Sequence, residues 1–206
     1  MMRAVGVMRL LCGLLLLGTA AAAQSDYPRL HDVVGVASND VLNVRAGPGA
    51  SHPIVGELAY DSRAVEVIRV EGNWGLVNVH ELPGWTSLRY LAPRVDGDIG
   101  NVPRLICGGT EPFWDIDIRP GQSATVKTPV NYEVGDTFSV GLMKRAYNPL
   151  EKWVLQGGAG ARDLSVVVVK AYCDNGMSDN EYGFDATVIV TGTDGYVLSG
   201  CCELAD

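Results

Sequence analysis

The stretch DVLNVRAGP, at residues 40–48, decides how the first half of the chain is interpreted. Leu42 and Val44 are two residues apart, so in an extended strand both side chains point to the same side. Asn43 and Arg45 point to the other side, and the Gly-Pro pair after them ends the strand. The stretch therefore predicts a strand with a buried apolar face and an exposed polar face, followed by an irregular loop.

The same kind of pattern recurs outward from this stretch, and no segment shows a convincing apolar period of 3.6 residues. Short runs rich in β-branched residues are separated by Gly, Pro, Asn and Asp, which is typical of sandwiches and small barrels. The predicted strands include Val33–Val36, Val41–Val44, Val65–Val70, Leu76–Val79, Trp114–Ile118, Leu164–Val169, Ala186–Val190 and Tyr196–Leu198. An all-β protein is expected.

Two local features depart from this pattern. The alternation in Val65–Val70 slips by one residue at Ile68, which predicts a β-bulge of the kind found where a small barrel turns a corner. Asn148–Trp153 alone predicts a helical turn, with Asn148 as its cap and Pro149 at the first helical position.

The first 23 residues are typical of an export signal rather than of folded structure. Arg3 and Arg9 precede an apolar run at residues 10–17, and small residues at Ala20–Ala23 close the segment. The apolar run is shorter than the roughly 20 residues that a membrane-spanning helix needs. A signal peptide at residues 1–23 is therefore predicted, with no stable membrane insertion after its cleavage.

Composition divides the remaining chain in two. Pro, Gly, Asp and Asn dominate residues 93–104, where no apolar pattern runs, so a linker is predicted there. Before it lies a module at residues 31–92 without cysteine. After it lies a domain at residues 105–206 that contains four cysteines.

The charge balance is acidic. Of 16 basic and 24 acidic side chains, two basic ones and no acidic one fall within residues 1–23, so the remaining chain has a net charge of −10. Binding to phosphate groups needs clustered cations. Nucleic acid and anionic membrane surfaces are therefore not expected as direct partners.

The four cysteines of the second domain predict disulfides, because an even count in an exported chain is typical of a disulfide framework. They are Cys107, Cys173, Cys201 and Cys202. A zinc site is the alternative, but the Cys-x-x-Cys pairs of zinc knuckles are missing. Adjacent residues of a strand point to opposite faces, so Cys201 and Cys202 are expected to bond two different partners rather than each other.

The first module resembles bacterial SH3 domains over nearly its whole length. The resemblance is carried by Leu42-Asn43-Val44-Arg45-Ala46-Gly47-Pro48, Ile54-Val55-Gly56, Val65-x-Val67, Asn73-Trp74-x-x-Val77, Gly84-Trp85 and Tyr90-Leu91. It implies an SH3-like small barrel of an envelope protein and a possible groove for cell wall peptides. The groove residues that the resemblance implies are Asn43, Arg45, Trp74, Trp85 and Tyr90.

Aromatic faces offer flat apolar contact and an arginine grips a carboxylate with two hydrogen bonds, so this residue set fits a peptide ligand. The structural alternative is that the two tryptophans pack in or beside the core and that Arg45 holds the following loop.

The second domain resembles an uncharacterised family of exported bacterial proteins over about residues 105–203. Three motifs carry the resemblance: Cys107-x-Gly109-x-Glu111-Pro112-Phe113-Trp114, Cys173-x-x-Gly176-Met177-Ser178-Asp179, and Gly200-Cys201. The resemblance implies a small antiparallel β-barrel or sandwich without established activity. Where the family pattern has a basic residue followed by Tyr-Pro, this chain has Asn180-Glu181-Tyr182-Gly183.

No catalytic constellation is found, and no enzyme activity is expected. His31, His52 and His80 all lie in or near the first module, which excludes a histidine-dependent nucleophile site confined to the second domain. The glycine cluster at residues 157–160 precedes a strand and lacks a following Lys-Ser or Lys-Thr, so it predicts a hairpin loop and not a phosphate cradle.

No metal or cofactor is predicted. Asp174, Asp179 and Glu181 are a calcium alternative, but they do not have the spacing of an EF-hand loop.

The sequence therefore predicts a non-catalytic binding or adaptor protein of the cell envelope, periplasmic or secreted. Its SH3-type module would contact cell wall peptide or an envelope protein. An inhibitor of an envelope enzyme such as lysozyme is an alternative by analogy of class. A carrier whose second domain encloses a small apolar molecule is a third hypothesis, based on the apolar run at Val166–Val169.

Overall fold

The computed structural model describes residues 26–147 and 151–206. The predicted signal peptide at residues 1–23 lies outside these ranges, as do Asn148 and Pro149. Nearly all of the described structure is β, as the sequence predicts. No helix in the described ranges has the length and apolar character needed to cross a membrane.

The predicted helical turn at Asn148–Trp153 is wrong in its last part. Trp153 belongs to strand β14 (Lys152–Ala159), where it pairs with Val168 of the neighbouring strand. Trp153 and Leu155 are buried, and the residues on either side of Leu155 are more exposed. The alternation of buried and exposed positions is that of a strand with one face in the core. The burial of Trp153 and Leu155 therefore outweighs the helix-capping signal of Asn148 and Pro149.

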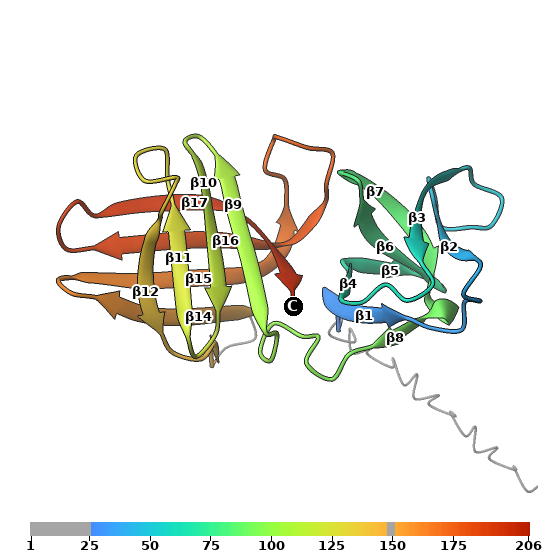
Figure 1. The fold of residues 1–206 in the computed structure, drawn as a ribbon, viewed down its shortest axis with the longest axis horizontal. Coiled ribbons are helices and arrows are strands. Elements are labelled where there is room, and N and C mark those ends of the chain that lie inside the picture. Colours follow the sequence, from blue (N-terminus) through green and yellow to red (C-terminus); the bar gives the residue numbers. More distant parts are fainter. Residues whose placement is uncertain (1–25, 148–150) are drawn as a thin grey trace, which may run out of the picture.

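The first module is an SH3-like small barrel built from two sheets (Figure 1). A three-stranded sheet has the order β4-β1-β8, and a five-stranded sheet has the order β3-β2-β7-β6-β5. The elements are β1 (Arg29–Val33), β2 (Val41–Arg45), β3 (Ile54–Ala59), β4 (Val65–Val67), β5 (Arg69–Glu71), β6 (Trp74–Val79), β7 (Leu82–Ser87), the 3₁₀ helix η1 (Leu88–Tyr90) and β8 (Leu91–Pro93).

The alternation slip at Ile68 marks the point where the chain changes sheets. β4 ends at Val67 in the three-stranded sheet, and β5 begins at Arg69 in the five-stranded sheet. The Ile68 amide between them donates a hydrogen bond to the carbonyl of Leu76. The sequence signal therefore located a corner of the module, although the corner is a break between two strands instead of a bulge within one.

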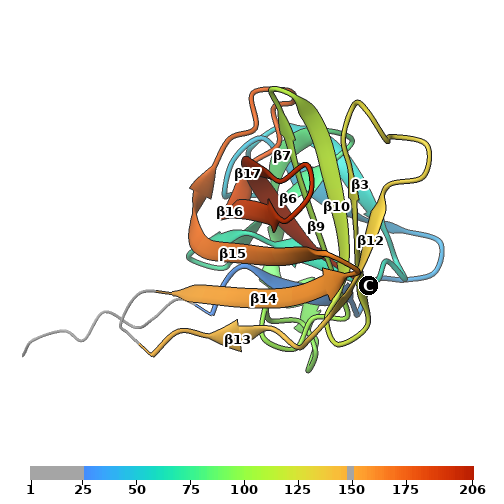
Figure 2. The same ribbon diagram turned by 90° about the vertical axis from the view of Figure 1, so that its left-hand side faces the viewer.

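The second domain is a closed antiparallel barrel. Its sheet has the order β12-β11-β10-β9-β17-β16-β15-β14-β13, and an additional pairing of β12 with β14 closes a ring of eight strands that leaves β13 outside (Figure 2). The strands are β9 (Arg104–Thr110), β10 (Phe113–Arg119), β11 (Ser123–Lys127), β12 (Asp136–Val140), β13 (Lys144–Arg145), β14, β15 (Arg162–Cys173), β16 (Tyr182–Thr191) and β17 (Tyr196–Ala205).

Side chains fill the interior of this barrel. Ile116, Ile118, Phe138, Leu155 and Val166 are all completely shielded from solvent and belong to one continuous hydrophobic cluster. They alternate with more exposed residues along their strands, which places them on the inner face. The apolar run at Val166–Val169 is therefore part of a packed barrel wall, with Val166 and Val168 buried.

Two disulfides join strands of the barrel. Cys107 is bonded to Cys202, 95 residues away, and Cys173 is bonded to Cys201, 28 residues away. The prediction that the adjacent cysteines have different partners is confirmed. Cys202 belongs to the core cluster inside the barrel, whereas Cys201 borders a hollow on the outside.

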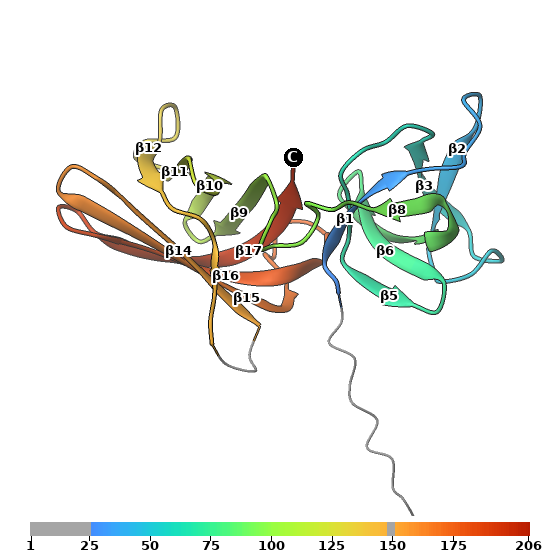
Figure 3. The same ribbon diagram turned by 90° about the horizontal axis from the view of Figure 1, so that it is seen from below.

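The segment between the two halves is packed rather than extended. Residues 94–103 connect β8 to β9, and two of their apolar side chains, Ile99 and Val102, are buried in the hydrophobic cluster of the barrel. Leu30 of β1 is also completely buried in that cluster, and its backbone exchanges hydrogen bonds with Arg94 and Gly97. The module and the barrel thus lie side by side with a shared strip of core (Figure 3).

Polar contacts also connect the module to the barrel, and together with the shared strip of core they form the joint between the two halves. The Asn78 amide side chain donates to the carbonyl of Glu181 at 2.8 Å and accepts from the Glu181 amide at 3.2 Å. The Arg69 guanidinium forms an ion pair with the Glu181 carboxylate. Near the C-terminus, which lies between the two halves in Figure 1, the Leu204 amide donates to the Glu66 carboxyl at 3.0 Å.

Candidate functional site

Four of the five residues predicted for the SH3-type groove line one hollow of about 420 Å³. Asn43 and Arg45 point outward from β2, and Trp74 begins β6, where it is opposite Ser87 of β7. Tyr90 reaches the hollow from the 3₁₀ helix η1. Residues that are distant in sequence therefore form one continuous surface with an aromatic part and a cationic part.

Arg45 has a second contact that bears on its role. Its Nη1 donates a hydrogen bond of 2.8 Å to the carbonyl of His52, at the far end of the loop that begins after β2. The imidazole of His52 in turn lies against Gly47, where a Cβ atom would come within 2.7 Å of the ring. Arg45 thus holds this loop in the way that the structural alternative predicts, while its side chain still lines the hollow.

Trp85 is not among the residues that line this hollow. It pairs with Leu76 across β6 and β7, and its side chain is only 7% exposed. The Arg69 guanidinium carbon lies 4.7 Å from the centre of its ring, within the range of a cation–π contact. Trp85 therefore forms a small buried cluster with Ile68 and Leu76, covered by the arginine that pairs with Glu181.

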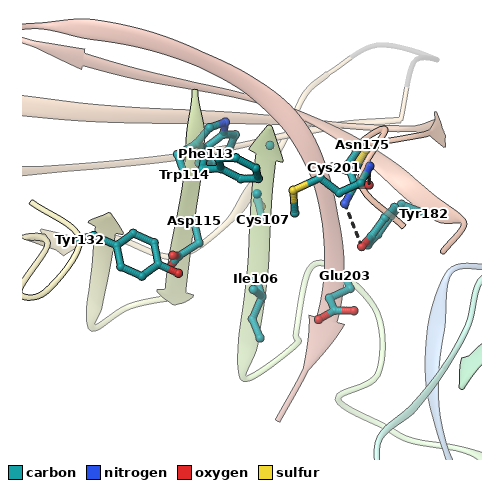
Figure 4. A pocket seen from close by; sticks show the side chains of 13 residues that line it. Ile106, Cys107, Phe113, Trp114, Asp115, Tyr132, Asn175, Tyr182, Cys201 and Glu203 are labelled. Atoms are coloured by element: carbon teal, nitrogen blue, oxygen red, sulfur yellow. Dashed lines mark hydrogen bonds between the residues drawn. The ribbon is translucent and has the colours of Figure 1, made fainter. Parts of the chain in front are cut away.

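A second hollow lies on the outside of the barrel, over β10, β9 and β17 (Figure 4). Its volume is about 230 Å³. Asp115, Gly108 and Cys201 stand opposite one another across the three strands. The middle member of this row has no side chain, so the floor of the hollow is backbone. Below the row, Ile106 and Glu203 form the next outward-facing pair.

Aromatic and polar side chains form the walls of this outer hollow. Figure 4 shows Tyr132 and Asp115 on one side, and Asn175 and Tyr182 on the other. The amide of Asn175 donates to the hydroxyl of Tyr182 at 3.1 Å, which fixes that wall. The exposed residues that complete the rim are Phe113 at 59%, Met177 at 55% and Tyr132 at 55% exposure.

The three cysteine-containing motifs of the second domain converge on this hollow. The first motif supplies Cys107 and Phe113, the second supplies Asn175 and Met177, and the third supplies Cys201. Sequence reasoning did not connect them as one site, because antiparallel pairing of β9 with β17 was needed to bring them together. Tyr132 was also missed, since it lies in the loop after β11, where no pattern marks it.

Glycines beside the motif cysteines make room for a buried indole. The Nε1 of Trp114 donates to the carbonyl of Ser199 at 3.3 Å. A Cβ atom on Gly109 would lie 2.5 Å from that nitrogen, and one on Gly200 would lie 2.9 Å from the indole ring. The Gly-Gly and Gly-Cys-Cys sequences thus have a packing role close to the hollow.

The carboxyl groups around the outer hollow fall into two classes. Burial raises the pKa of Asp115 and of Glu203 above their ordinary values, and both line the hollow. The pKa of Asp117 is instead lowered by two hydrogen bonds from Arg104, at 2.9 and 2.7 Å. Asp115 and Glu203 therefore lack the full hydration that an exposed carboxylate has.

The calcium alternative finds no support in the arrangement of the polar loop after β15. Glu181 forms an ion pair with Arg69 of the SH3-like module. Across residues 26–147 and 151–206, no group of three or more His, Cys, Asp and Glu side chains is arranged to hold a metal ion.

A comparison with protein families identifies a bacterial SH3 domain at residues 40–92. The fold of the first module agrees with this match, and strand β1, which precedes the matched range, pairs with β4 and β8 of the same module. The comparison gives no support to the predicted family resemblance of residues 105–203. No curated protein and no solved structure shows significant similarity to the chain.

The chain therefore combines a bacterial SH3 domain, which is a module of the cell-wall-binding type, with a disulfide-bonded eight-stranded barrel. Bacterial SH3 domains in general bind cell wall peptides. The domain and the two disulfides fit an extracellular or periplasmic protein.

Proposed function

We propose that this protein is an exported, non-catalytic cell-envelope binding protein whose SH3-type module holds a cell wall peptide. The observation that carries the proposal is the hollow in which Asn43, Arg45, Trp74 and Tyr90 come together. These are four of the five residues that the resemblance to bacterial SH3 domains assigns to a ligand groove. The fifth, Trp85, supports the sheet beneath Arg69.

The chemistry of the hollow fits a short peptide with a free carboxylate. A guanidinium donates two parallel hydrogen bonds to a carboxylate, and an indole or phenol ring gives a flat surface for the peptide backbone. At about 420 Å³ the hollow is within the size range of small-ligand sites. A hollow of this size admits a short peptide segment.

Co-sedimentation of the mature chain with purified peptidoglycan tests the proposal. Wild-type protein is expected to pellet with the polymer, and Trp74→Ala and Tyr90→Ala are each expected to reduce the bound fraction several-fold. Tyr60→Ala is the matched control, because Tyr60 is an exposed aromatic residue of the same module that does not line the hollow. Wild-type retention by both hollow variants would show that the wall is bound elsewhere or not at all.

Arg45 needs two variants because it both lines the hollow and holds the loop. Arg45→Lys keeps the charge but loses the bidentate geometry, whereas His52→Ala leaves the His52 carbonyl in place and removes only the ring against Gly47. Under the proposal, Arg45→Lys weakens co-sedimentation and His52→Ala does so less. The reverse order would assign Arg45 to loop support alone.

The carrier hypothesis has less support than wall binding. It requires an apolar space inside the barrel, and the interior is filled by the side chains of the core cluster. The inhibitor hypothesis has one favourable observation, which is the exposed aromatic rim of the outer hollow. Addition of the protein to a lysozyme turbidity assay tests it directly, and an unchanged rate of lysis over a range of protein concentrations would rule it out for that enzyme.

A further inference from the structure

The outer hollow of the barrel has features of a recognition site that wall binding by the SH3-type module does not use. It lies on a different domain, and its lining comes from four strands and two loops. At about 230 Å³ it is smaller than the roughly 300–1,000 Å³ typical of small-ligand pockets. A space of this size admits a single side chain and not a whole cofactor.

The exposed surface around the hollow is suited to a protein partner. Phe113, the first residue of β10, and Met177, in the loop between β15 and β16, are exposed at its rim. The loop that contains Tyr132 also exposes Val130 and Val134, at 95% and 81%. Exposed apolar residues gathered around a small hollow are typical of protein interfaces in which one anchor side chain is inserted.

The charged residues that line the hollow favour an anchor side chain with a positive charge. Asp115 and Glu203 are the only charged residues among the described residues that line the hollow. The nearest cations already have partners. Arg104 and Arg119 both pair with Asp117, and the charge of Arg104 also acts on Glu203, where it partly offsets the rise in pKa that burial causes. The Lys127 ammonium lies 5.5 Å from the centre of the Tyr132 ring. Lys127 is also opposite Asp115 across β10 and β11, so it shares that carboxylate with any guest.

We propose that the outer hollow receives a lysine or arginine side chain from a protein partner, with Asp115 and Glu203 binding its charge and Phe113 and Tyr132 covering its alkyl part. Carboxylates that burial has partly dehydrated gain from a buried cation, and aromatic rings add cation–π attraction. The net charge of −8 on the whole chain steers a basic partner toward it.

The test uses the full chain and two capped tripeptides, acetyl-Ala-Lys-Ala-amide and its norleucine analogue, which has nearly the same alkyl chain without the charge. Binding is followed by two-dimensional NMR through the amides of Gly108 and Cys201 in the floor of the hollow. The lysine peptide is expected to shift these signals with a dissociation constant on the order of 1 mM. The norleucine peptide is expected to bind at least about tenfold more weakly, because it lacks the charge-assisted hydrogen bonds.

Four variants separate a built site from general charge attraction. Asp115→Asn and Glu203→Gln are each expected to weaken the lysine peptide about tenfold. Glu133→Gln removes the same charge from the exposed loop beside Tyr132 but outside the hollow, and is expected to leave the affinity unchanged. Lys127→Gln is expected to strengthen binding, because it removes the native competitor for Asp115.

The outcomes decide the matter in either direction. Equal binding of the two peptides would mean an apolar hollow without selection for charge, and no shift with either peptide would mean no such site. An equal loss in Glu133→Gln and Asp115→Asn would reduce the effect to long-range attraction. Each of these overturns the proposal, and none depends on whether the SH3-type module binds the cell wall.

Discussion

The two halves of this protein are stabilised in different ways. The barrel has one continuous hydrophobic cluster and both disulfides. The SH3-like module has two smaller clusters and no cysteine. A domain of about 60 residues is close to the lower limit for a self-sufficient core. The first strand of the module adds to this small core, because its Leu30 is buried in the core of the barrel.

This difference has a consequence for binding. Because the SH3-like module is docked against the barrel, its hollow has a defined orientation relative to the outer hollow of the barrel. Glu181 and Asn78 lie in this joint, next to the polar loop that also supplies Met177 to the outer hollow. The joint therefore links the surroundings of both candidate sites.

The largest expected effect is the loss of the long-range disulfide. Replacement of Cys107 and Cys202 by alanine opens a link across 95 residues and is expected to lower the free energy of unfolding by about 4–5 kcal/mol. The same change at Cys173 and Cys201, which spans 28 residues, is expected to cost about 3–4 kcal/mol. Urea unfolding of both double variants measures the two costs. A larger cost for the shorter link would mean that local packing, and not chain entropy, dominates.

The next effect tests whether the module depends on the barrel. Leu30→Ala leaves a cavity in the barrel cluster and is expected to cost about 3 kcal/mol, with faster amide hydrogen exchange in β9 and β17. Val33→Ala is the matched control, because Val33 lies on the same strand but packs in the module's own cluster. If the exchange effect of Leu30→Ala stayed within β1, β4 and β8, the shared core would be of no energetic importance.

The strand residues were predictable from the sequence where a local pattern was sufficient. The alternation at Leu42 and Val44 gave β2 its buried face, and the rule for adjacent strand residues gave Cys201 and Cys202 separate partners. Four of the five groove residues were brought together because they follow a family pattern within one small module.

The remaining features depend on how separate elements dock, and no local pattern encodes them. Leu30 looks like any apolar strand residue, and only the position of the barrel decides which core receives it. Residues 93–104 have the composition of a linker, yet Ile99 and Val102, two of its three aliphatic side chains, anchor the segment in the barrel cluster. Tyr132 lies in a loop without periodicity, so its place beside Asp115 follows from the barrel alone.

A smaller effect is expected from the polar contact between the halves. Asn78→Ala leaves the amide and carbonyl of Glu181 without their side-chain partner and is expected to cost about 2 kcal/mol. Asn73→Ala is the control, because Asn73 lies in the exposed turn before β6. Urea unfolding measures the cost, and small-angle scattering of the folded variant reports whether the halves separate. Equal stabilities of the two variants would show that water replaces the Asn78 contact without loss.

The last expected effect is a pH dependence of stability that comes from Glu66, and it is small over any single pH unit. Burial raises the pKa of this carboxyl to about 8, and the nearby Glu203 raises it further, while the hydrogen bond from the Leu204 amide acts in the opposite direction. Between the ordinary value near 4.5 and about 8, the folded state keeps a proton that the unfolded state has lost. Stability therefore falls as the pH rises through this window, by at most about 1.4 kcal/mol per pH unit, and the loss is constant above it.

Glu66→Gln keeps an acceptor for the Leu204 amide and cannot ionise, so the variant is expected to match wild type near pH 4.5 and to exceed it increasingly up to about pH 8. His31 titrates in part of the same window with the opposite sign, because burial lowers its pKa and its protonation costs stability as the pH falls. That contribution is present in both proteins and cancels in their difference. Thermal or urea unfolding at several pH values gives this difference directly, and a constant gap between the two curves would show that Glu66 is already ionised in the joint.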